Sequence, residues 1–193
     1  MLRLRPFDLR TPASLDEAVR LLAEATAGAQ VIAGGTDLLP NMKLLQSDPP
    51  LLVSLRDVPA LSGVDHIAAD ADNAERLTVG ATTRLVDVAE SPEIRRFLPA
   101  FAHAAGRIAG PQIRNMATLG GNLCLDTRCR YINQSELFRD ALGGCLKSHG
   151  VECHVVPGGQ GCVAALSTDS APVLIAYGAS LDLIGPQGAR SLP

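Results

Sequence analysis

The chain has 193 residues, of which 47% are hydrophobic and only 3% aromatic, and its formal net charge is −3. This length allows one ordinary globular domain or two small ones. The 17 basic residues form no long run and are outnumbered by 20 acidic ones, which argues against a nucleic acid or an anionic membrane as partner. The N-terminus alternates leucine and arginine and lacks the apolar run of a signal peptide or membrane span, so we expect a cytoplasmic protein.

The first sixty residues predict a small β-α-β unit. Ser14 and Glu17 form the sequence signature of a capping box, which opens a helix over about 15–25. An apolar strand over 30–33 then passes through a Gly-Gly turn into a second helix over about 38–45. A further apolar run at 51–55, bounded by prolines, completes the unit.

The rest of the chain predicts two hairpins separated by helices. The first hairpin has strands at 64–68 and 77–81 and a polar turn at 70–75. One helix begins near Thr83, and another runs from Ser91, its N-cap, through Arg107. Toward the C-terminus we expect a helix over 171–177 and a strand over 180–184. The strand that follows from Ala189 is barely begun when the chain stops, so we infer a fragment of a longer protein.

Two glycine-rich loops carry the strongest chemical signal. The first reads VIAGGTDLL over 31–39, and the second reads ATLGGN over 117–122. Glycines between a strand and a helix permit positive φ angles and close backbone approach, and unpaired N–H groups there favour an anion such as a pyrophosphate. One such loop alone is more often a simple tight turn. Two of them, the second preceded by the basic Arg114, predict two phosphate-sized sites facing each other across a cleft. Neither loop matches a Walker or a G-x-G-x-x-G pattern.

The five cysteines form no disulfide framework, because their number is odd and the compartment is expected to be reducing. Four of them, Cys129, Cys145, Cys153 and Cys162, have the spacing C-x15-C-x7-C-x8-C, without the C-x2-C pairs of structural zinc. This spacing does not exclude zinc, and four unassociated buried thiols are an equal alternative. The nearby His149 and His154 are interpreted as surface or supporting groups rather than as ligands.

At these residues the chain resembles a known family. The loops AGGTDLLP and RNMATLGGN, in this order and at this separation, are specific to the flavin subunits of molybdenum hydroxylases, the group of xanthine dehydrogenase and carbon monoxide dehydrogenase. The resemblance covers essentially the whole chain. The cysteine-rich stretch is similar to an insertion that carries a 4Fe-4S cluster in the beta subunits of 4-hydroxybenzoyl-CoA reductases.

The resemblance implies an α+β fold, the two-subdomain FAD-binding fold of the PCMH type, without the family's C-terminal domain. Residues 1–58 would form an N-terminal β-α-β FAD-binding subdomain. Residues 59–193 would form a second FAD-binding subdomain that contains the cysteine-rich insertion at about 123–166.

The resemblance also assigns residues to the two cofactors. The four cysteines named above would bind the 4Fe-4S cluster, and Cys124 would be a small buried residue near the flavin. Asp37 would cap the following helix with its carboxylate turned away from the cofactor, and Asp169 has the alternative role of a helix N-cap. The residues expected to contact FAD are Val31, Ile32, Ala33, Gly34, Gly35, Thr36, Asp37, Leu38, Thr118, Leu119, Gly120, Gly121, Asn122, Asp126 and Asp169.

The implied function is electron transfer, with no catalytic residue on this chain. FAD exchanges electrons in pairs or singly, and the cluster would connect it to an external carrier. The implied partners are a large molybdenum-cofactor subunit and a small 2Fe-2S subunit, with ferredoxin as a candidate donor. Removal of the phenolic hydroxyl of an aromatic acyl-CoA, a step in aromatic degradation, would occur on the large subunit. Two alternatives stay open: a flavin subunit of another hydroxylase with zinc or nothing on its cysteines, and a non-catalytic truncated module.

Overall fold

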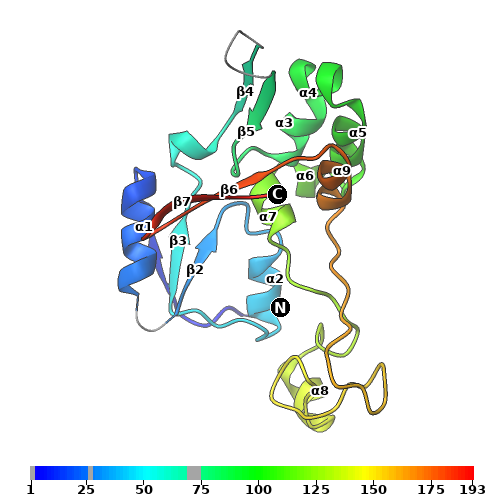
Figure 1. The fold of residues 1–193 in the computed structure, drawn as a ribbon. Coiled ribbons are helices and arrows are strands. Elements are labelled where there is room, and N and C mark those ends of the chain that lie inside the picture. Colours follow the sequence, from blue (N-terminus) through cyan, green and yellow to red (C-terminus); the bar gives the residue numbers. More distant parts are fainter. Residues whose placement is uncertain (1–2, 26–27, 69–74) are drawn as a thin grey trace. The chain divides into compact units, whose positions relative to one another are not determined.

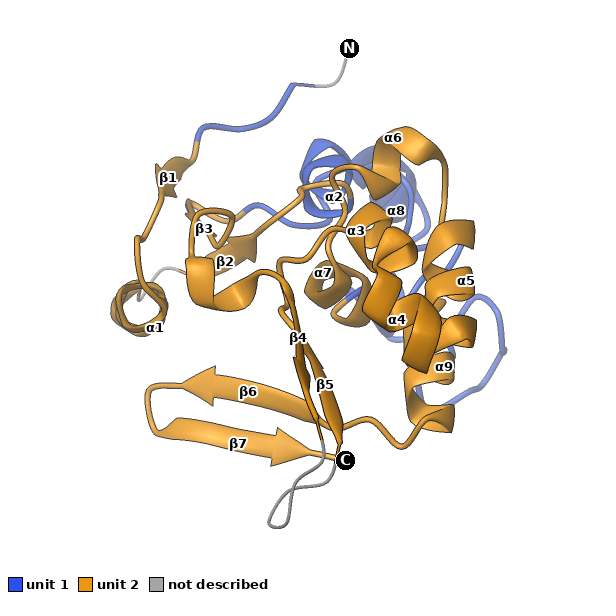
Figure 2. Ribbon diagram, turned by 90° about the horizontal axis from the view of Figure 1, so that it is seen from above, with its two compact units in different colours: residues 1–6, 37–48, 125–167 blue, residues 7–36, 49–124, 168–193 orange. Residues whose placement is uncertain are grey.

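The computed structural model describes residues 3–25, 28–68 and 75–193 (Figure 1). The chain forms two compact units, and each is assembled from separate stretches of sequence (Figure 2). Unit 1 comprises residues 1–6, 37–48 and 125–167, and unit 2 comprises residues 7–36, 49–124 and 168–193. The division at residue 58 that the sequence predicts does not coincide with a boundary of these units, and it stays a prediction.

The N-terminal part of unit 2 contains a parallel three-stranded sheet in the order β1-β3-β2. The strands are β1 (Asp8–Arg10), β2 (Ala29–Ile32) and β3 (Leu51–Ser54). The central strand β3 holds Leu52 and Val53, both fully buried. The strand–helix–strand order expected for this region is confirmed, but β1 escaped the sequence analysis because its three residues are all exposed and carry no apolar run.

Helix α1 (Leu15–Glu24) begins at the capping box that the sequence indicates. The Ser14 Oγ accepts a hydrogen bond from the Glu17 backbone N–H at 3.2 Å. The Glu17 carboxylate accepts a hydrogen bond from the Ala13 backbone N–H at 2.9 Å. In the standard capping box the donor is one residue later, at the N-cap itself. Two N–H groups at the helix start are thereby satisfied.

Two antiparallel hairpins complete the strands of unit 2. The first joins β4 (Val64–Ile67) to β5 (Arg76–Val79), as expected, while the predicted turn at 70–75 lies almost wholly outside the described residues. The second joins β6 (Leu181–Gly185) to β7 (Gly188–Leu192). The expectation that its second strand is barely begun is wrong, because Gly188, with φ of +101°, turns the chain early and all five residues of β7 pair with β6.

The helices of unit 2 surround its main hydrophobic core. They are α3 (Leu85–Glu90), α4 (Pro92–Phe97), α5 (Pro99–Arg107), α6 (Pro111–Arg114), α7 (Leu119–Leu123) and α9 (Ser170–Ala176). The core consists of Val88, Ile94, Phe101, Ala102, Ala105 and Leu119, with Val173 and Leu174 of α9 packed against it. Among the described residues, every helix falls short of the length and apolarity that a bilayer crossing requires.

The single helix predicted from Ser91 to Arg107 is in fact two. Ser91 caps α4 as expected, accepting the Ile94 N–H at 3.2 Å. Leu98 then leaves the helical region, with φ of −133° and ψ of 57°, and α5 begins at Pro99. Proline lacks an N–H and disfavours a helical conformation in the residue before it, which accounts for the break.

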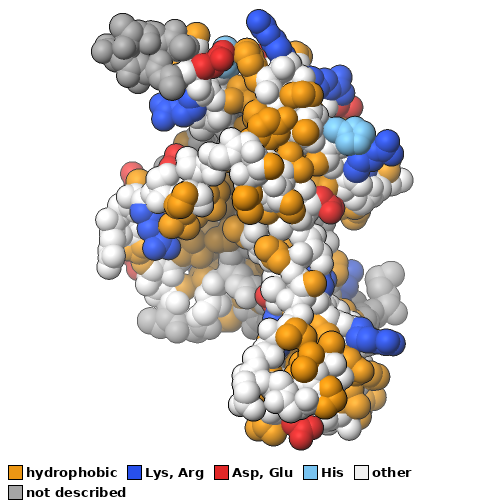
Figure 3. All heavy atoms as spheres, turned by 45° about the vertical axis from the view of Figure 1, so that its right-hand side comes forward, with side chains coloured by type: hydrophobic (Ala, Val, Ile, Leu, Met, Phe, Trp, Pro, Cys, Tyr) orange, Lys and Arg blue, Asp and Glu red, His pale blue; other side chains and the backbone are white. Residues whose placement is uncertain are grey.

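Within its described residues, unit 1 contains two short helices, α2 (Leu38–Lys43) and α8 (Glu136–Ala141), which lie in separate stretches of the chain. Among its described hydrophobic side chains, Met42 alone is buried. Many others are exposed, including Leu137 at 80% and Val151 at 87%. The lower part of the view in Figure 3 shows such side chains gathered on the surface. The described residues of unit 1 therefore form little fully buried hydrophobic core.

Replacement of Phe101 by alanine tests the assignment of the core of unit 2. Phe101 is fully buried in the helical core, so we expect Phe101→Ala to lower the free energy of unfolding by about 3–5 kcal/mol. Ile113→Ala is the control, because that side chain is 41% exposed and its loss should cost less than about 1 kcal/mol. Urea denaturation followed by circular dichroism measures both values, and equal losses would contradict the assignment.

Candidate functional site

The two glycine loops contact each other through backbone atoms, with no side chain between them. A Cβ atom added to Gly34 would lie only 1.9 Å from the carbonyl oxygen of Met116, just before the second loop. In the second loop, a Cβ atom on Gly120 would lie 2.8 Å from the carbonyl oxygen of Ala81. Real Cβ atoms do not approach other atoms so closely, so both positions require glycine. Close backbone packing thus explains why glycine is found at one position in each of the two loops.

The first loop presents free backbone donors. Gly35 has φ of +69°, a conformation that favours glycine. Within the described residues, no hydrogen bond uses the N–H groups of Gly34, Gly35 or Thr36. They follow strand β2 and precede α2, the arrangement in which unpaired N–H groups bind phosphate oxygens. This loop fits the pyrophosphate of a dinucleotide cofactor.

In the second loop, most backbone donors are already used. The N–H of Leu119 donates to Thr83 O at 2.9 Å, and that of Gly120 donates to Ala81 O at 2.8 Å. The N–H of Gly121 donates to its cap, Thr118 Oγ1, at 3.2 Å. These bonds start α7 and attach the loop to the body of unit 2. The second loop is therefore fixed in place by its own backbone hydrogen bonds. A direct role of residues 118–122 in binding FAD stays a prediction.

The asparagine that ends the second loop, Asn122, has a structural role. The residue is 7% exposed, and its Oδ1 accepts hydrogen bonds from Thr168 Oγ1 at 2.8 Å and from the Ser170 N–H at 3.3 Å. The Asn122 side chain thus fixes the start of α9 against α7. Asp169 lies between these two donors and is exposed. It occupies the N-cap position of α9, its expected alternative role, but its side chain makes no capping hydrogen bond.

A hollow of about 250 Å³ lies where the two loops meet. Ala33, Gly34 and Thr118 line it, as do three side chains that the sequence analysis missed, Arg56, Arg84 and Asn115. Arg84 forms a bidentate ion pair with Asp87, in which Nε lies 2.6 Å from Oδ2. Hydrogen bonding to this carboxylate raises the pKa of Arg84. No ion pair within the described ranges includes Arg56. Its position just after strand β3 is the signal that would have found it, because ligands bind at the carboxyl ends of parallel strands.

Arg114, which the sequence analysis placed beside the second loop, does not line this hollow. Its guanidinium donates to Ile108 O at 2.8 Å and to Ala109 O at 2.7 Å. Ala109 has φ of +47°, an uncommon conformation for alanine. Arg114 therefore holds the turn between α5 and α6.

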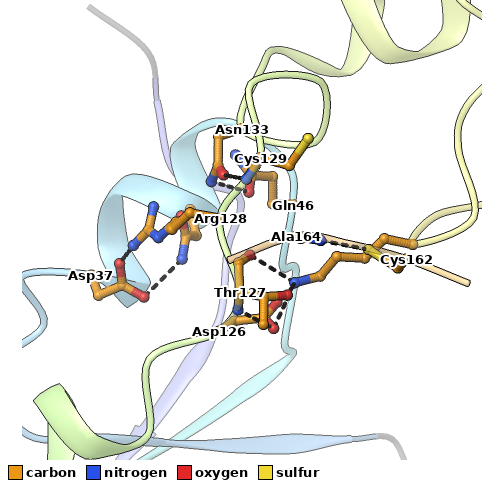
Figure 4. Close-up of polar contacts among 11 residues, drawn as sticks. Asp37, Gln46, Asp126, Thr127, Arg128, Cys129, Asn133, Cys162 and Ala164 are labelled. Atoms are coloured by element: carbon orange, nitrogen blue, oxygen red, sulfur yellow. Dashed lines mark hydrogen bonds and ion pairs between the residues drawn. The ribbon is translucent and has the colours of Figure 1, made fainter. Parts of the chain in front are cut away.

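Asp37 and Asp126 are both engaged in ion pairs within unit 1 (Figure 4). The Asp37 carboxylate contacts Arg128 and accepts from Asn41 Nδ2 at 3.0 Å. Asp37 occupies the N-cap position of α2, as expected, but its carboxylate makes no capping bond, because the nearby guanidinium is the stronger partner. Asp126 accepts from Lys147 Nζ at 2.7 Å, and this bond lowers the pKa of Asp126.

The four cysteines of the predicted quartet line one hollow in unit 1. Its volume is about 20 Å³, against about 250 Å³ for the hollow beside the glycine loops, and Tyr131, Lys147 and His154 also line it. Cys124 lies outside it, in unit 2, and is exposed, so the expectation of a buried Cys124 is wrong. In the part of the chain that the structure describes, no three His, Cys, Asp or Glu side chains are close enough to hold a single metal ion.

Hydrogen-bond donors approach three of the four sulfurs. The Val156 N–H lies 3.4 Å from Cys153 Sγ, and the Ala164 N–H lies 3.4 Å from Cys162 Sγ. The Ser148 hydroxyl lies 3.8 Å from Cys145 Sγ. The N–H groups of Val156 and Val155 lower the pKa of the Cys153 thiol. Donors of this kind favour the thiolate, which is the form that ligates metals.

The surroundings of the fourth cysteine and of the two histidines are also polar. The Cys129 N–H donates to Asn133 Oδ1 at 3.0 Å, and Asn133 Nδ2 donates to Gln46 Oε1 at 3.1 Å (Figure 4). His154 Nε2 lies 2.6 Å from Gly144 O, and the exposed His149 lies 3.6 Å from Asp140. Both histidines thus have partners other than sulfur, and their interpretation as supporting groups stays a prediction.

Comparison with known proteins identifies the family. The model of the FAD binding domain in molybdopterin dehydrogenase matches residues 5–193. The chain belongs to this family. It is 37% identical over 117 residues to the carbon monoxide dehydrogenase medium chain of Hydrogenophaga pseudoflava, covering 61% of this chain and 39% of that one. It is 36% identical over 173 residues to the aldehyde oxidoreductase FAD-binding subunit PaoB of Escherichia coli, covering 87% of this chain and 52% of PaoB.

Two further matches extend over nearly the whole chain. The xanthine dehydrogenase FAD-binding subunit of Escherichia coli is 30% identical over 181 residues, covering 94% of this chain and 47% of the subunit. A solved structure of carbon monoxide dehydrogenase from Hydrogenophaga pseudoflava superimposes with a TM-score of 0.71 at 30% identity, covering 99% of this chain and 51% of that one. The predicted FAD-binding fold is confirmed. The chain spans about half the length of these relatives, or less.

The contact between Gly34 and Met116 yields a test of the flavin site. Gly34→Ala would drive the two loops apart, so we expect FAD affinity to fall by roughly tenfold or more, equal to about 1.4 kcal/mol. Gly185→Ala is the matched control, because a Cβ atom there meets nothing within 4 Å. Flavin absorbance after purification and fluorescence titration of the apoprotein measure the loss. Wild-type FAD binding by the first variant would contradict this geometry.

The donors around Cys153 yield a test that needs no metal. The pKa of the Cys153 thiol is lowered, so its alkylation in the metal-free chain should reach half-maximal rate at a pH below the ordinary 9.0. Val156→Pro removes the N–H that points at the sulfur and should move this midpoint upward, whereas Val156→Ala keeps the N–H and should leave it in place. Mass spectrometry of iodoacetamide-treated protein across pH gives the midpoints. Equal midpoints in all three proteins would show that the N–H has no influence.

Proposed function

We propose that this chain is the flavin-binding part of an electron-transfer subunit in a cytoplasmic molybdenum oxidoreductase. Residues 31–38 and 118–122, with Asp126 and Asp169, contact FAD, and Cys129, Cys145, Cys153 and Cys162 bind a 4Fe-4S cluster. One observation carries the cluster assignment: the four thiols line a single hollow in a unit that buries one hydrophobic side chain among its described residues. Four thiols gathered in this way are a complete ligand set for such a cluster.

The weak core of unit 1 supports a bound cluster. Units of this size rarely fold on hydrophobic burial alone and usually contain disulfides or a metal site. All five cysteines are free, so disulfides do not supply the missing stabilisation. Metal binding to thiolates contributes directly to the free energy of folding. A cluster in the cysteine-lined hollow would therefore stabilise the unit that surrounds it.

The number of thiols at the hollow equals the number of ligands that a 4Fe-4S cluster takes. Zinc holds four ligands at about 2.3 Å from one centre, so its sulfurs must lie close together. Within the described residues no three ligand side chains lie that close, although the four thiols share one hollow. In a 4Fe-4S cluster each of the four thiolates binds a different iron. The N–H groups directed at Cys153 and Cys162 are the kind of donor that tunes the potential of such a cluster.

The flavin part of the proposal rests on the first glycine loop. Bound FAD supplies exchange of electrons in pairs or singly. The free N–H groups of Gly34, Gly35 and Thr36 hold its diphosphate, and the Arg56 guanidinium adds positive charge to the same hollow. In the sequence, the cysteine-rich stretch is inserted between Asn122 and Asp169, and Asp37 directly follows the first loop. The segments proposed for the two cofactors are thus neighbours in the sequence.

The partners and substrate follow from the proposed relay. The relatives are named as medium chains or FAD-binding subunits, and we propose a large molybdenum subunit and a small 2Fe-2S subunit for this chain as well. Ferredoxin is the proposed electron donor, and the reaction is reductive dehydroxylation of an aromatic acyl-CoA, as in 4-hydroxybenzoyl-CoA reductase. The exposed apolar side chains of unit 1, such as Leu137 and Val151, support a protein partner there.

A second candidate is the flavin part of an oxidising hydroxylase without a cluster. It is favoured by the names of the relatives, which include xanthine dehydrogenase, aldehyde oxidoreductase and carbon monoxide dehydrogenase. The two candidates differ in what occupies the cysteines. Iron, acid-labile sulfide and zinc contents of anaerobically purified protein separate them, because zinc alone or no metal would remove the cluster.

Replacement of single cysteines tests the ligand assignment. Cys145→Ser removes a thiol that lines the hollow, so we expect loss of the 4Fe-4S signal in low-temperature EPR of the reduced protein, with FAD retained. Cys124→Ser is the matched control, because Cys124 is exposed and lies outside the hollow, and its signal should equal that of the wild type. An unchanged signal in the first variant would remove Cys145 from the ligand set.

A further inference from the structure

Arg139 is a buried cation in unit 1 whose side chain binds only backbone oxygens. The residue is 8% exposed, although it lies on α8, whose other residues are mostly exposed. Its Nη1 donates to Leu44 O at 3.1 Å and to Gln134 O at 2.5 Å, and its Nη2 donates to Leu45 O at 2.7 Å. Leu45 has φ of +53°, so the guanidinium also secures an unusual backbone turn after α2.

The charge of Arg139 has no carboxylate to balance it. None of the ion pairs among the described residues includes Arg139. Its neighbours in unit 1 behave differently, because Arg128 pairs with Asp37 and Lys147 pairs with Asp126. Carbonyl dipoles satisfy hydrogen bonds but do not neutralise a charge, and a buried charge without a counter-ion is costly. The burial of Arg139 therefore calls for an anion nearby.

The cysteine-lined hollow is where that anion belongs. Arg139 lines a second, smaller hollow together with Cys145, Tyr131 and His154, and these three residues also line the cysteine-lined hollow. The backbone joins the two hollows as well. The Gly144 N–H donates to Arg139 O at 2.9 Å, and Gly144 O lies 2.6 Å from His154 Nε2. Arg139 and Cys145 thus line one small hollow, and Cys145 also lines the cysteine-lined hollow.

We propose that Arg139 is the counter-charge of the metal cluster and raises its reduction potential. This inference rests on the proposed function, since it presupposes a 4Fe-4S cluster on the four cysteines. Four thiolates leave such a cluster with net negative charge, and reduction adds one electron more. A fixed cation therefore stabilises the reduced form more than the oxidised form, and in a poorly solvated site this effect is screened little by salt. Arg139 is a positioning residue and not a ligand.

The test is an EPR-monitored redox titration of the anaerobically purified full chain and three variants. Arg139→Gln removes the charge, and we expect its cluster midpoint to move in the negative direction by at least about 59 mV, a tenfold change in the reduced-to-oxidised ratio of a one-electron couple. Arg139→Lys keeps the charge but not the planar fork of donors, and its midpoint should stay near that of the wild type. Arg130→Gln is the matched control, because Arg130 is exposed and its removal should leave the midpoint nearly unchanged.

Each outcome decides a different question. A wild-type chain without a cluster signal refutes the proposed function itself, and the inference with it. A cluster in Arg139→Gln with the wild-type midpoint, or a shift equal to that of Arg130→Gln, overturns the electrostatic role while the proposed function stands. Loss of the cluster from both Arg139→Gln and Arg139→Lys also overturns it and leaves a structural role. Loss from Arg139→Gln alone, with the wild-type midpoint in Arg139→Lys, supports the requirement for charge.

Discussion

The contact of the Gly34 backbone with Met116 O is the constraint on which the flavin site depends. It brings the end of β2 to the start of the second loop, and it leaves no room for any side chain. The second loop is fixed in turn by hydrogen bonds from the Leu85 N–H to Ala117 O and from the Leu119 N–H to Thr83 O. Leu85 and Leu119 are buried, so hydrophobic packing determines where the second loop lies. The free N–H groups of the first loop can bind a ligand in a defined position because the second loop, which they adjoin, is held rigidly in this way.

The two units are stabilised by different means, and each means suits one proposed cofactor. Unit 2 has a hydrophobic core around Phe101 and can hold a preformed cleft. In unit 1 the described residues provide ion pairs, an asparagine bridge from Cys129 to Gln46, and the carbonyl contacts of Arg139. Contacts of this kind are individually weak in water and depend on one another. A unit held in this way would gain most of its rigidity from whatever binds its four thiols.

The sequence could predict those features that local patterns determine. The capping box at Ser14, the hairpin of β4 with β5 and the glycine loops all follow from residues that are neighbours in the chain. Features that depend on tertiary contacts were missed. Strand β1 is too short and exposed to show a pattern, and Arg56 joins the cleft only through the fold. Arg139 would be taken from its sequence ELFRDA for an exposed helical arginine, because nothing local reveals the carbonyls of Leu44 and Leu45 that bury it.

The distribution of charge in unit 1 gives Arg139 its particular position. Lys147 also lines the cysteine-lined hollow, but its charge is cancelled by Asp126. The pKa of Asp126 is lowered from 3.8, chiefly by the hydrogen bond from Lys147. A carboxylate with a lowered pKa contributes stability that is present above its unfolded pKa and is lost as the pH falls through its folded pKa. The Lys147–Asp126 pair is thus neutral as a whole at neutral pH. The charge of Arg128 is balanced in the same way by the carboxylate of Asp37. Arg139 is then a buried cation beside the cysteine-lined hollow that takes part in none of the ion pairs among the described residues, and its charge would stabilise added negative charge in that hollow.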